Sequence, residues 1–201
     1  MRRPNHPRSP STILACYVLA VAAFGCSTNT DEPTSAPAAA PLALSSLNLS
    51  EGGAFQTVNT CAGDNVSPQL SWTGGPAETL TYALTLTDLT AGTTQWALWN
   101  VTASVRSLPA GLSRDPLLPN NPNLAVPTSA LQSESAGAFG YQGPCPMGAT
   151  HTFQLRIDAL GTASLPGLAA GSDPGAVAAA ASSASLGHAE INASSNASPS
   201  P

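Results

Sequence analysis

The most constraining feature of the sequence is a run of period two at residues 150–160, directly after the turn Gly-Tyr-Gln-Gly-Pro-Cys-Pro-Met-Gly at 140–148. Polar residues at even positions alternate with apolar residues at odd positions, which predicts a strand with one buried face. His151 is the first residue of that face. It can line a pocket beside the turn, or it can simply satisfy a backbone carbonyl at a strand end, because a lone histidine is a weak signal.

The N-terminal residues 1–25 are predicted to be a secretory signal. Arginines precede an apolar run at 13–24 that is too short to cross a bilayer. The run ends in Val-Ala-Ala-Phe-Gly-Cys, so small residues precede Cys26 as in a bacterial lipobox, and Cys26 is the predicted lipidation site. The lipobox usually has leucine where Ala23 stands. Cleavage after Ala23 or Gly25 without lipid is the alternative.

Composition then divides the exported chain. Residues 26–42 are rich in Ser, Thr, Pro and Ala without apolar periodicity, which is typical of a flexible tether. Residues 43–193 are long enough for one domain with a hydrophobic core. Residues 194–201 are polar and are expected to form a disordered tail.

Charge is sparse and mainly acidic, with 6 basic and 11 acidic residues and no lysine. Once the signal is removed, the basic residues are Arg106, Arg114 and Arg156. Nucleic acid is excluded as a partner because no basic patch can neutralise phosphates.

Two of the 4 cysteines, Cys61 and Cys145, fall within the predicted domain. Both lie in loops rich in Gly and Pro, and two cysteines in an oxidising compartment are expected to pair. The spacing of Cys and His gives no metal signature, and we expect neither a metal nor a cofactor.

The domain is predicted to be mostly β, with antiparallel strands and long loops. An alanine-rich helix is expected at 174–185, with Asp173 as N-cap and Pro174 at its first position. The proline-rich segment 106–128 is interpreted as a long surface excursion. The predicted strands are 69–72, 79–87, 95–102, 152–160 and a short last strand at 188–191.

Four segments, at 59–72, 95–104, 108–112 and 140–153, together resemble the phosphatidylethanolamine-binding protein family, in its bacterial, Raf-kinase-inhibitor-like (YbhB/YbcL-type) branch. The resemblance covers nearly all of 42–193. It implies a large central antiparallel sheet, a smaller second sheet and a short helix near the C-terminus. It also implies a small surface pocket that accepts phosphate or a phospholipid headgroup.

The resemblance places the ligand-binding pocket at residues that match the family's motifs one by one. Asp88 matches the first aspartate of an Asp-Pro-Asp-Ala-Pro loop, and His151 matches the histidine that opens a strand. The remaining candidates come from the His-Trp pair and the Tyr-x-Gly-Pro turn, and they are Gln95, Trp96, Tyr141, Gly143 and Pro144. Trp96 has an alternative role in the core, and Asp88 has one as a turn former.

The sequence departs from the family at two places. The loop after Asp88 reads Leu-Thr-Ala-Gly and lacks the prolines and the second aspartate. Gln95 stands where the family has a histidine, and an amide cannot carry a proton as an imidazole does. We therefore expect anion affinity to be lowered by roughly 10- to 100-fold, which is the effect of losing one charge-assisted hydrogen bond.

The function predicted from these features is an exported binding protein of the bacterial envelope, tethered to a membrane through Cys26, with a shallow pocket for a small anionic or polar ligand. No nucleophile-elbow pattern is present, and we do not expect an enzyme. The alternative is a protein-interaction or inhibitory domain whose pocket binds nothing small, with 106–128 as its contact surface. A secreted soluble form is the alternative location.

Overall fold

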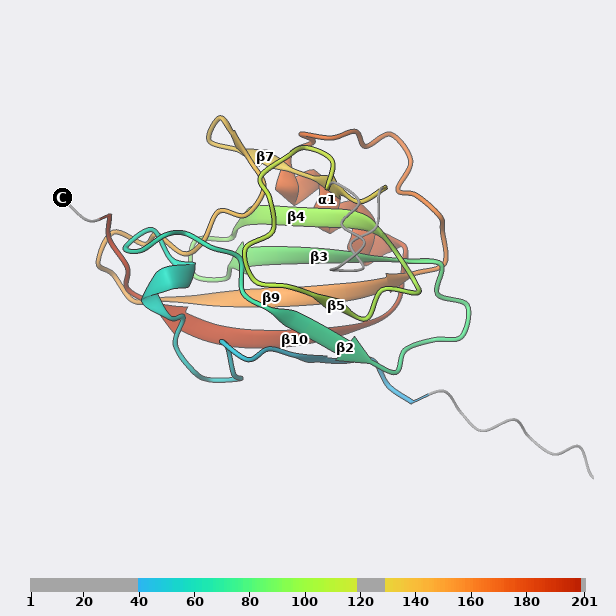
Figure 1. The fold of residues 1–201 in the computed structure, drawn as a ribbon, viewed down its shortest axis with the longest axis horizontal. Coiled ribbons are helices and arrows are strands. Elements are labelled where there is room, and N and C mark those ends of the chain that lie inside the picture. The colour runs from blue at the N-terminus through green and yellow to red at the C-terminus, as the bar shows by residue number, and fades with distance from the viewer. Residues whose placement is uncertain (1–39, 119–128, 200–201) are drawn as a thin grey trace, which may run out of the picture. The chain divides into compact units, whose positions relative to one another are not determined.

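A five-stranded antiparallel sheet in the order β10-β9-β3-β4-β6 forms the centre of the computed structural model, which describes residues 40–118 and 129–199 (Figure 1). Its strands are β3 (Thr81–Asp88), β4 (Thr93–Thr102), β6 (Leu131–Gln132), β9 (His151–Leu160) and β10 (Ser185–Ser195). The alternating side chains predicted at 150–160 form β9, which lies between β10 and β3.

A second, three-stranded sheet crosses one face of the large sheet (Figure 1). It consists of β1 (Ala43–Ser45), β2 (Leu70–Thr73) and β5 (Ser107–Leu108), in the order β1-β2-β5. A short 3-10 helix, η1 (Thr57–Asn59), lies between β1 and β2 in the chain. The hairpin of β7 (Glu134–Ser135) and β8 (Ala138–Phe139) precedes the turn that leads into β9.

The α-helix of the described residues, α1 (Pro174–Ser183), packs on the opposite face of the large sheet, mainly against β4 (Figure 1). The Asp173 side chain accepts a hydrogen bond from the Ala176 N–H at 2.9 Å, and Pro174 is the first helical residue. These are the start signals read from the sequence. The helix ends at Ser183, two residues before the predicted end at 185.

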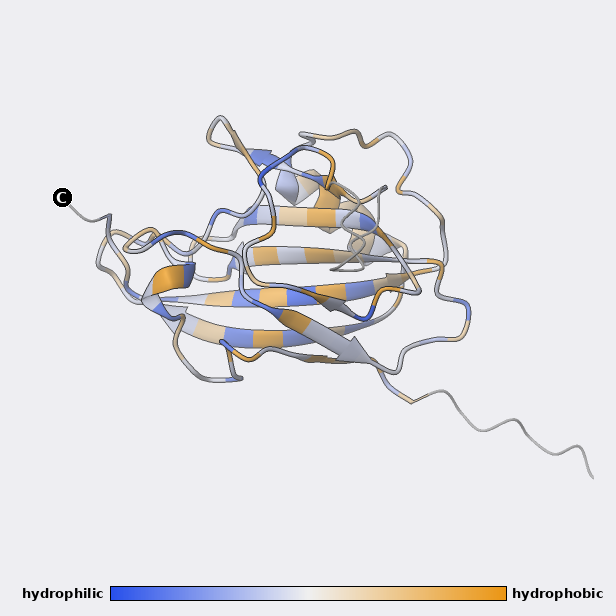
Figure 2. Ribbon diagram, in the orientation of Figure 1, coloured by the Kyte–Doolittle hydropathy of each residue, from blue (hydrophilic) through white to orange (hydrophobic). Residues whose placement is uncertain are grey.

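The core therefore has two layers. The layer between the two sheets contains the larger side chains, including Trp72, Trp96 and Phe153, and Trp72 packs edge-to-face on Tyr82. The layer under α1 is built on small residues that let the helix approach Trp99. Apolar and polar positions alternate along β9 in Figure 2, but the last four residues of the strand, from Ile157 to Leu160, are buried on both faces.

The mostly β fold with a large sheet, a smaller sheet and a short late helix is confirmed. The tail predicted from 194 is wrong for its first two residues, because Ser194 and Ser195 pair with Thr152 and His151 in the sheet. The last strand runs from Ser185 to Ser195 and is much longer than the predicted 188–191. Of the excursion at 106–128, Ser107 and Leu108 form β5, and 119–128 lie outside the described residues.

The described chain begins at the end of the large sheet that is remote from His151. The Gly75 N–H donates to the Ala40 carbonyl at 2.8 Å, and β3 begins shortly after that contact. Thr81 of β3 pairs with Leu160, the last residue of β9, whereas His151 is the first. The signal and the tether predicted at 1–25 and at most of 26–42 lie outside the described residues.

Candidate functional site

Asp88 and His151 meet at one end of the large sheet. The His151 Nδ1 lies 2.6 Å from the Asp88 Oδ2, although 63 residues separate the two in sequence. Asp88 ends β3 and His151 opens β9, so antiparallel pairing of the two strands brings them together. The Asp88 side chain is 5% exposed and the His151 side chain 22%, so a buried carboxylate holds a partly exposed ring.

The other oxygen of Asp88 forms a turn. Its Oδ1 accepts hydrogen bonds from the Thr90 and Ala91 N–H groups, each at 2.9 Å. The Thr90 hydroxyl in turn accepts from the Thr152 N–H at 3.0 Å, which fastens the loop to β9. Asp88 thus forms the turn considered from the sequence through one oxygen, and its other oxygen orients the imidazole of His151.

Trp96 and Tyr141 lie inside the core. Trp96 is fully buried and its indole N–H donates to the Gln132 Oε1 at 3.2 Å, while Tyr141 is 1% exposed. The two rings pack edge-to-face with centroids 5.5 Å apart. The Tyr141 hydroxyl donates to the Asn59 carbonyl at 2.9 Å, and burial raises the pKa of this phenol. The indole N–H and the phenol of these two residues are therefore already bonded within the core.

The turn at 140–148 is fastened to the segment before β2. The Gly143 N–H donates to the Asn65 Oδ1 at 2.7 Å, and the Cys61 N–H donates to the Pro144 carbonyl at 3.2 Å. A Cβ at Gly143 would lie 2.2 Å from the Asn59 carbonyl oxygen, so only glycine fits there. Gly143 and Pro144 are both buried and shape the loop through their backbone.

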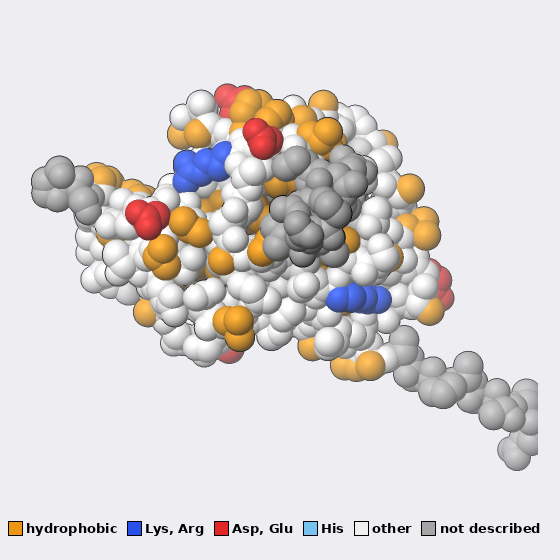
Figure 3. Space-filling model, viewed as in Figure 1, with side chains coloured by type: hydrophobic (Ala, Val, Ile, Leu, Met, Phe, Trp, Pro, Cys, Tyr) orange, Lys and Arg blue, Asp and Glu red, His pale blue; other side chains and the backbone are white. Residues whose placement is uncertain are grey.

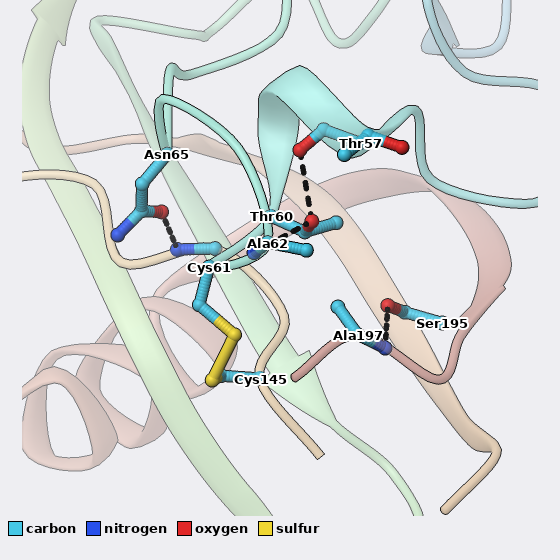
Figure 4. The surroundings of a disulfide bond; sticks show 9 residues. Thr57, Thr60, Cys61, Ala62, Asn65, Cys145, Ser195 and Ala197 are labelled. Atoms are coloured by element: carbon cyan, nitrogen blue, oxygen red, sulfur yellow. Dashed lines mark hydrogen bonds between the residues drawn. A yellow bond between two sulfur atoms is a disulfide. The ribbon is translucent and has the colours of Figure 1, made fainter. Parts of the chain in front are cut away.

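A disulfide bond joins the same two segments. Cys61 and Cys145 are bonded in the structure with an S–S distance of 2.04 Å, which is the pairing predicted from the sequence (Figure 4). Figure 4 places the bond between the loop after η1 and the turn, close to the end of β10. The wall of the site next to His151 is therefore cross-linked.

Two glutamines on segments next to the Asp88–His151 pair have buried polar atoms without partners. The Gln95 Oε1, on β4, and the Gln142 Nε2, in the turn, have no hydrogen-bond partner among the described residues. A buried polar atom without a partner is rare and calls for a water or a ligand. Gln142 was not predicted from the sequence, because it occupies the variable position of the Tyr-x-Gly-Pro pattern.

The arginines in the described residues make other contacts. Arg106 donates to the Tyr82 hydroxyl and Arg114 to the Asn65 carbonyl, the latter at 2.8 Å. Arg156 bonds to Asp158 and Glu190, and its hydrogen bond to Asp158 is the largest of the effects that raise its pKa. Lys and Arg side chains are correspondingly sparse on the face seen in Figure 3. Because these arginines contact other residues, an anion bound at His151 would be held by the imidazole and by neutral hydrogen-bond donors.

A cleft of about 300 Å³ opens next to His151. Its walls come from the segment 54–62, from Thr150 and from residues 194–197 at the end of β10. Ser195 pairs directly with His151 across β10 and β9, and Thr150 precedes His151 in the chain. None of the seven predicted pocket residues lines this cleft, which lies on the β10 side of His151.

The sequence of residues 45–196 matches the family model described as phosphatidylethanolamine-binding protein. The chain belongs to the phosphatidylethanolamine-binding protein (PEBP) family.

Similarity to UPF0098 proteins, YbcL among them, places it in the YbhB/YbcL-type branch of the PEBP family. The chain is 33% identical over 116 residues to a UPF0098 protein of Methanothermobacter thermautotrophicus, covering 57% of this chain and 73% of that protein. It is 33% identical over 113 residues to YbcL of Escherichia coli, covering 53% and 58% of the two chains. It is also 33% identical over 130 residues to LppC of Mycobacterium tuberculosis, by its name a candidate lipoprotein, covering 65% and 60%.

The solved structure of Escherichia coli YbcL, titled a new member of the mammalian PEBP family, supports the same assignment. It matches with a TM-score of 0.67 at 26% identity and covers 79% of this chain and 99% of that one. The sequence match spans less than two thirds of YbcL and of LppC.

Within 40–118 and 129–199, no group of three or more His, Cys, Asp or Glu side chains is arranged to hold a metal ion. No helix in these residues has the length and apolar character needed to cross a membrane.

Proposed function

We propose that this protein is an exported, membrane-tethered binding protein that holds a small anionic ligand, a phosphate or a phospholipid headgroup, at His151. The observation that carries the proposal is the contact of 2.6 Å between the buried Asp88 carboxylate and the His151 Nδ1. A carboxylate that binds one ring nitrogen fixes the orientation of the imidazole and leaves the other nitrogen for a ligand. No described residue makes a hydrogen bond to the His151 Nε2.

The polar atoms without partners support a ligand of this kind. Gln142 offers an unpaired amide donor, which suits an anionic oxygen, and Gln95 offers an unpaired amide oxygen, which suits a protonated one. A monoprotonated phosphate carries both kinds of oxygen. Because the amide orientation of a glutamine is assigned from its surroundings, either group can exchange these roles by a flip.

The ligand is expected to bind weakly. Gln95 takes the place of a second imidazole, and the described arginines bind elsewhere in the protein. Losing one charge-assisted hydrogen bond costs about 1.5–3 kcal/mol, which lowers affinity by roughly 10- to 100-fold. We expect dissociation constants in the millimolar range for inorganic phosphate.

The test is a titration of the purified protein with inorganic phosphate and with phosphoethanolamine, followed through the His151 ring resonances by NMR. The expected result is a saturable shift of His151 that His188, which is half exposed on β10, does not share. A His151→Gln variant should abolish binding, whereas His188→Gln should leave it unchanged. If millimolar ligand shifts neither ring, the alternative of a protein-interaction domain is favoured.

The tether is the second part of the proposal. The lipobox-like sequence before Cys26 and the similarity to LppC support a lipid on Cys26 and a position in the bacterial cell envelope. The intact mass of the mature protein would reveal a lipid on residue 26. A Cys26→Ser variant should move from the detergent phase to the aqueous phase, and an unmodified wild-type mass would refute the anchor. The family's name describes binding, and we propose no catalytic activity.

A further inference from the structure

The cleft beside His151 has a chemical character of its own. Its polar lining consists of Thr57, Thr60, Thr150, Ser194, Ser195 and Asn196. Among the described residues, none that lines the cleft carries a charge. A charged group placed there would lose hydration without gaining an opposite charge, so the cleft disfavours ions. An acyl chain is disfavoured as well, because it would cover hydroxyl groups and offer them no partner.

Some of the lining hydroxyls are already bonded within the protein and others are free. Thr60 donates to the Thr57 carbonyl at 2.8 Å, and Ser194 donates to the Gly53 carbonyl at 3.2 Å. Ser195 accepts from the Ala197 N–H at 3.2 Å, which leaves its own proton available. Thr57 and Asn196 are exposed and their side chains make no hydrogen bond to a described residue. The free groups are therefore neutral hydroxyl and amide donors and acceptors.

One aromatic ring completes the lining. Phe55 lies in the wall of the cleft and packs edge-to-face on Phe153, with ring centroids 6.0 Å apart, so its orientation is fixed. Ligand sites typically combine an apolar or aromatic surface with a few placed polar groups and begin at about 300 Å³. The size of this cleft suits a single sugar ring, whose hydroxyls meet the rim while its apolar face packs on the phenyl ring.

The walls of the cleft are built before any ligand arrives. The Phe55 N–H donates to the Ser194 carbonyl at 2.9 Å, which fixes the 54–62 segment to the edge of β10. The disulfide between Cys61 and Cys145 fixes the same segment to the turn before β9 (Figure 4). A preformed site spends little of its binding energy on ordering loops.

The cleft and the anion site adjoin each other. Ser195 and His151 are directly opposite in adjacent strands, a Cα separation of about 5 Å in an antiparallel pair. We propose that the two form one composite site and that its ligand is a phosphate ester of an uncharged sugar or polyol, with the phosphate at His151 and the hydroxylated group in the cleft. This inference rests on the proposed anion site and names the class of ligand that the site takes.

The experiment compares inorganic phosphate, glucose 1-phosphate and methyl glucoside as probes of the mature full-length protein by NMR titration. Glucose 1-phosphate should bind about tenfold more tightly than phosphate, because two or three neutral hydrogen bonds are added. The double variant Thr57→Ala, Asn196→Ala should remove that advantage and leave the phosphate affinity unchanged. Ser164→Ala removes an exposed hydroxyl beyond the far end of β9 and should change neither affinity.

The outcomes separate the two proposals. Equal affinities for glucose 1-phosphate and phosphate, or an advantage that survives in the double variant, would overturn the composite site while leaving the anion site intact. If phosphate shifts no resonance, the proposed anion site is refuted, and the titration with methyl glucoside then tests the cleft alone. A saturable shift of the Thr57 and Ser195 amides, lost in the double variant, would support a neutral sugar subsite, and the absence of any shift would overturn it.

Discussion

Replacing Asp88 by asparagine tests whether the carboxylate organises this end of the sheet. The carboxylate accepts three hydrogen bonds, from the Thr90 and Ala91 N–H groups at 2.9 Å and at the His151 ring at 2.6 Å. Asparagine keeps one oxygen for the turn, and its amide group faces the imidazole. Since a hydrogen bond to a charged group contributes about 1.5–3 kcal/mol and a neutral one about 0.5–1.5, the free energy of unfolding should fall by about 2–3 kcal/mol.

Urea unfolding measures this loss. With a slope of about 2–3 kcal/mol per molar urea, the midpoint of Asp88→Asn should fall by about 1 M. Asp64→Asn makes the same chemical change at an exposed aspartate and should stay within about 0.5 kcal/mol of the wild type. A double-mutant cycle with His151→Gln isolates the pair itself, with an expected coupling of about 1–2 kcal/mol. A coupling near zero would refute the claim that Asp88 holds the ring.

Further predictions concern the anion site, the cross-link and the buried phenol. Gln95→His should tighten phosphate binding by about 10- to 100-fold in the NMR titration, and unchanged affinity would contradict the role assigned to residue 95. Replacing Cys61 and Cys145 by serine should lower the free energy of unfolding by about 4–5 kcal/mol in the chain-entropy model, because 84 residues separate them; equal urea midpoints would contradict this. Tyr141→Phe should cost about 1–3 kcal/mol, because the buried Asn59 carbonyl loses its donor, and a smaller cost would mean that another group replaces it. Burial raises the pKa of Tyr141, so the neutral phenol is favoured in the folded state. The contribution of Tyr141 to the free energy of unfolding should therefore be complete below about pH 10 and fall above it, and Tyr141→Phe should lack this loss. Equal slopes of stability against pH in the two proteins would contradict the assignment.

The strands with strong alternation could be predicted from the sequence, and those without it could not. β9 begins one residue before its predicted start, and the helix begins at the predicted proline. β10 was predicted far too short because Gly187, Ala189 and Ala193 are too small to mark a buried face. β5 was not predicted, because two residues within a proline-rich segment carry no period.

Residues of the site could be predicted from the sequence only where they match a family motif. The contact between Asp88 and His151 followed from the resemblance, and the structure brings the two together. Periodicity could not indicate that the side chains of Trp96 and Tyr141 form hydrogen bonds within the core. Their partners, Gln132 and Asn59, are distant in the chain. The cleft could not be foreseen, because its hydroxyls come from loops and a strand end that only the folded chain brings together.

The contact between Ala40 and Gly75 shows by which end of the sheet an anchored molecule would be held. Ala40 enters the domain beside the start of β3, while His151 opens β9 at the opposite end of the sheet, about 30 Å away along a ten-residue strand. An attachment anywhere before Ala40 would hold the sheet by its far end. The point at which the tether joins the domain would then lie away from the imidazole and would leave access to His151 uncovered.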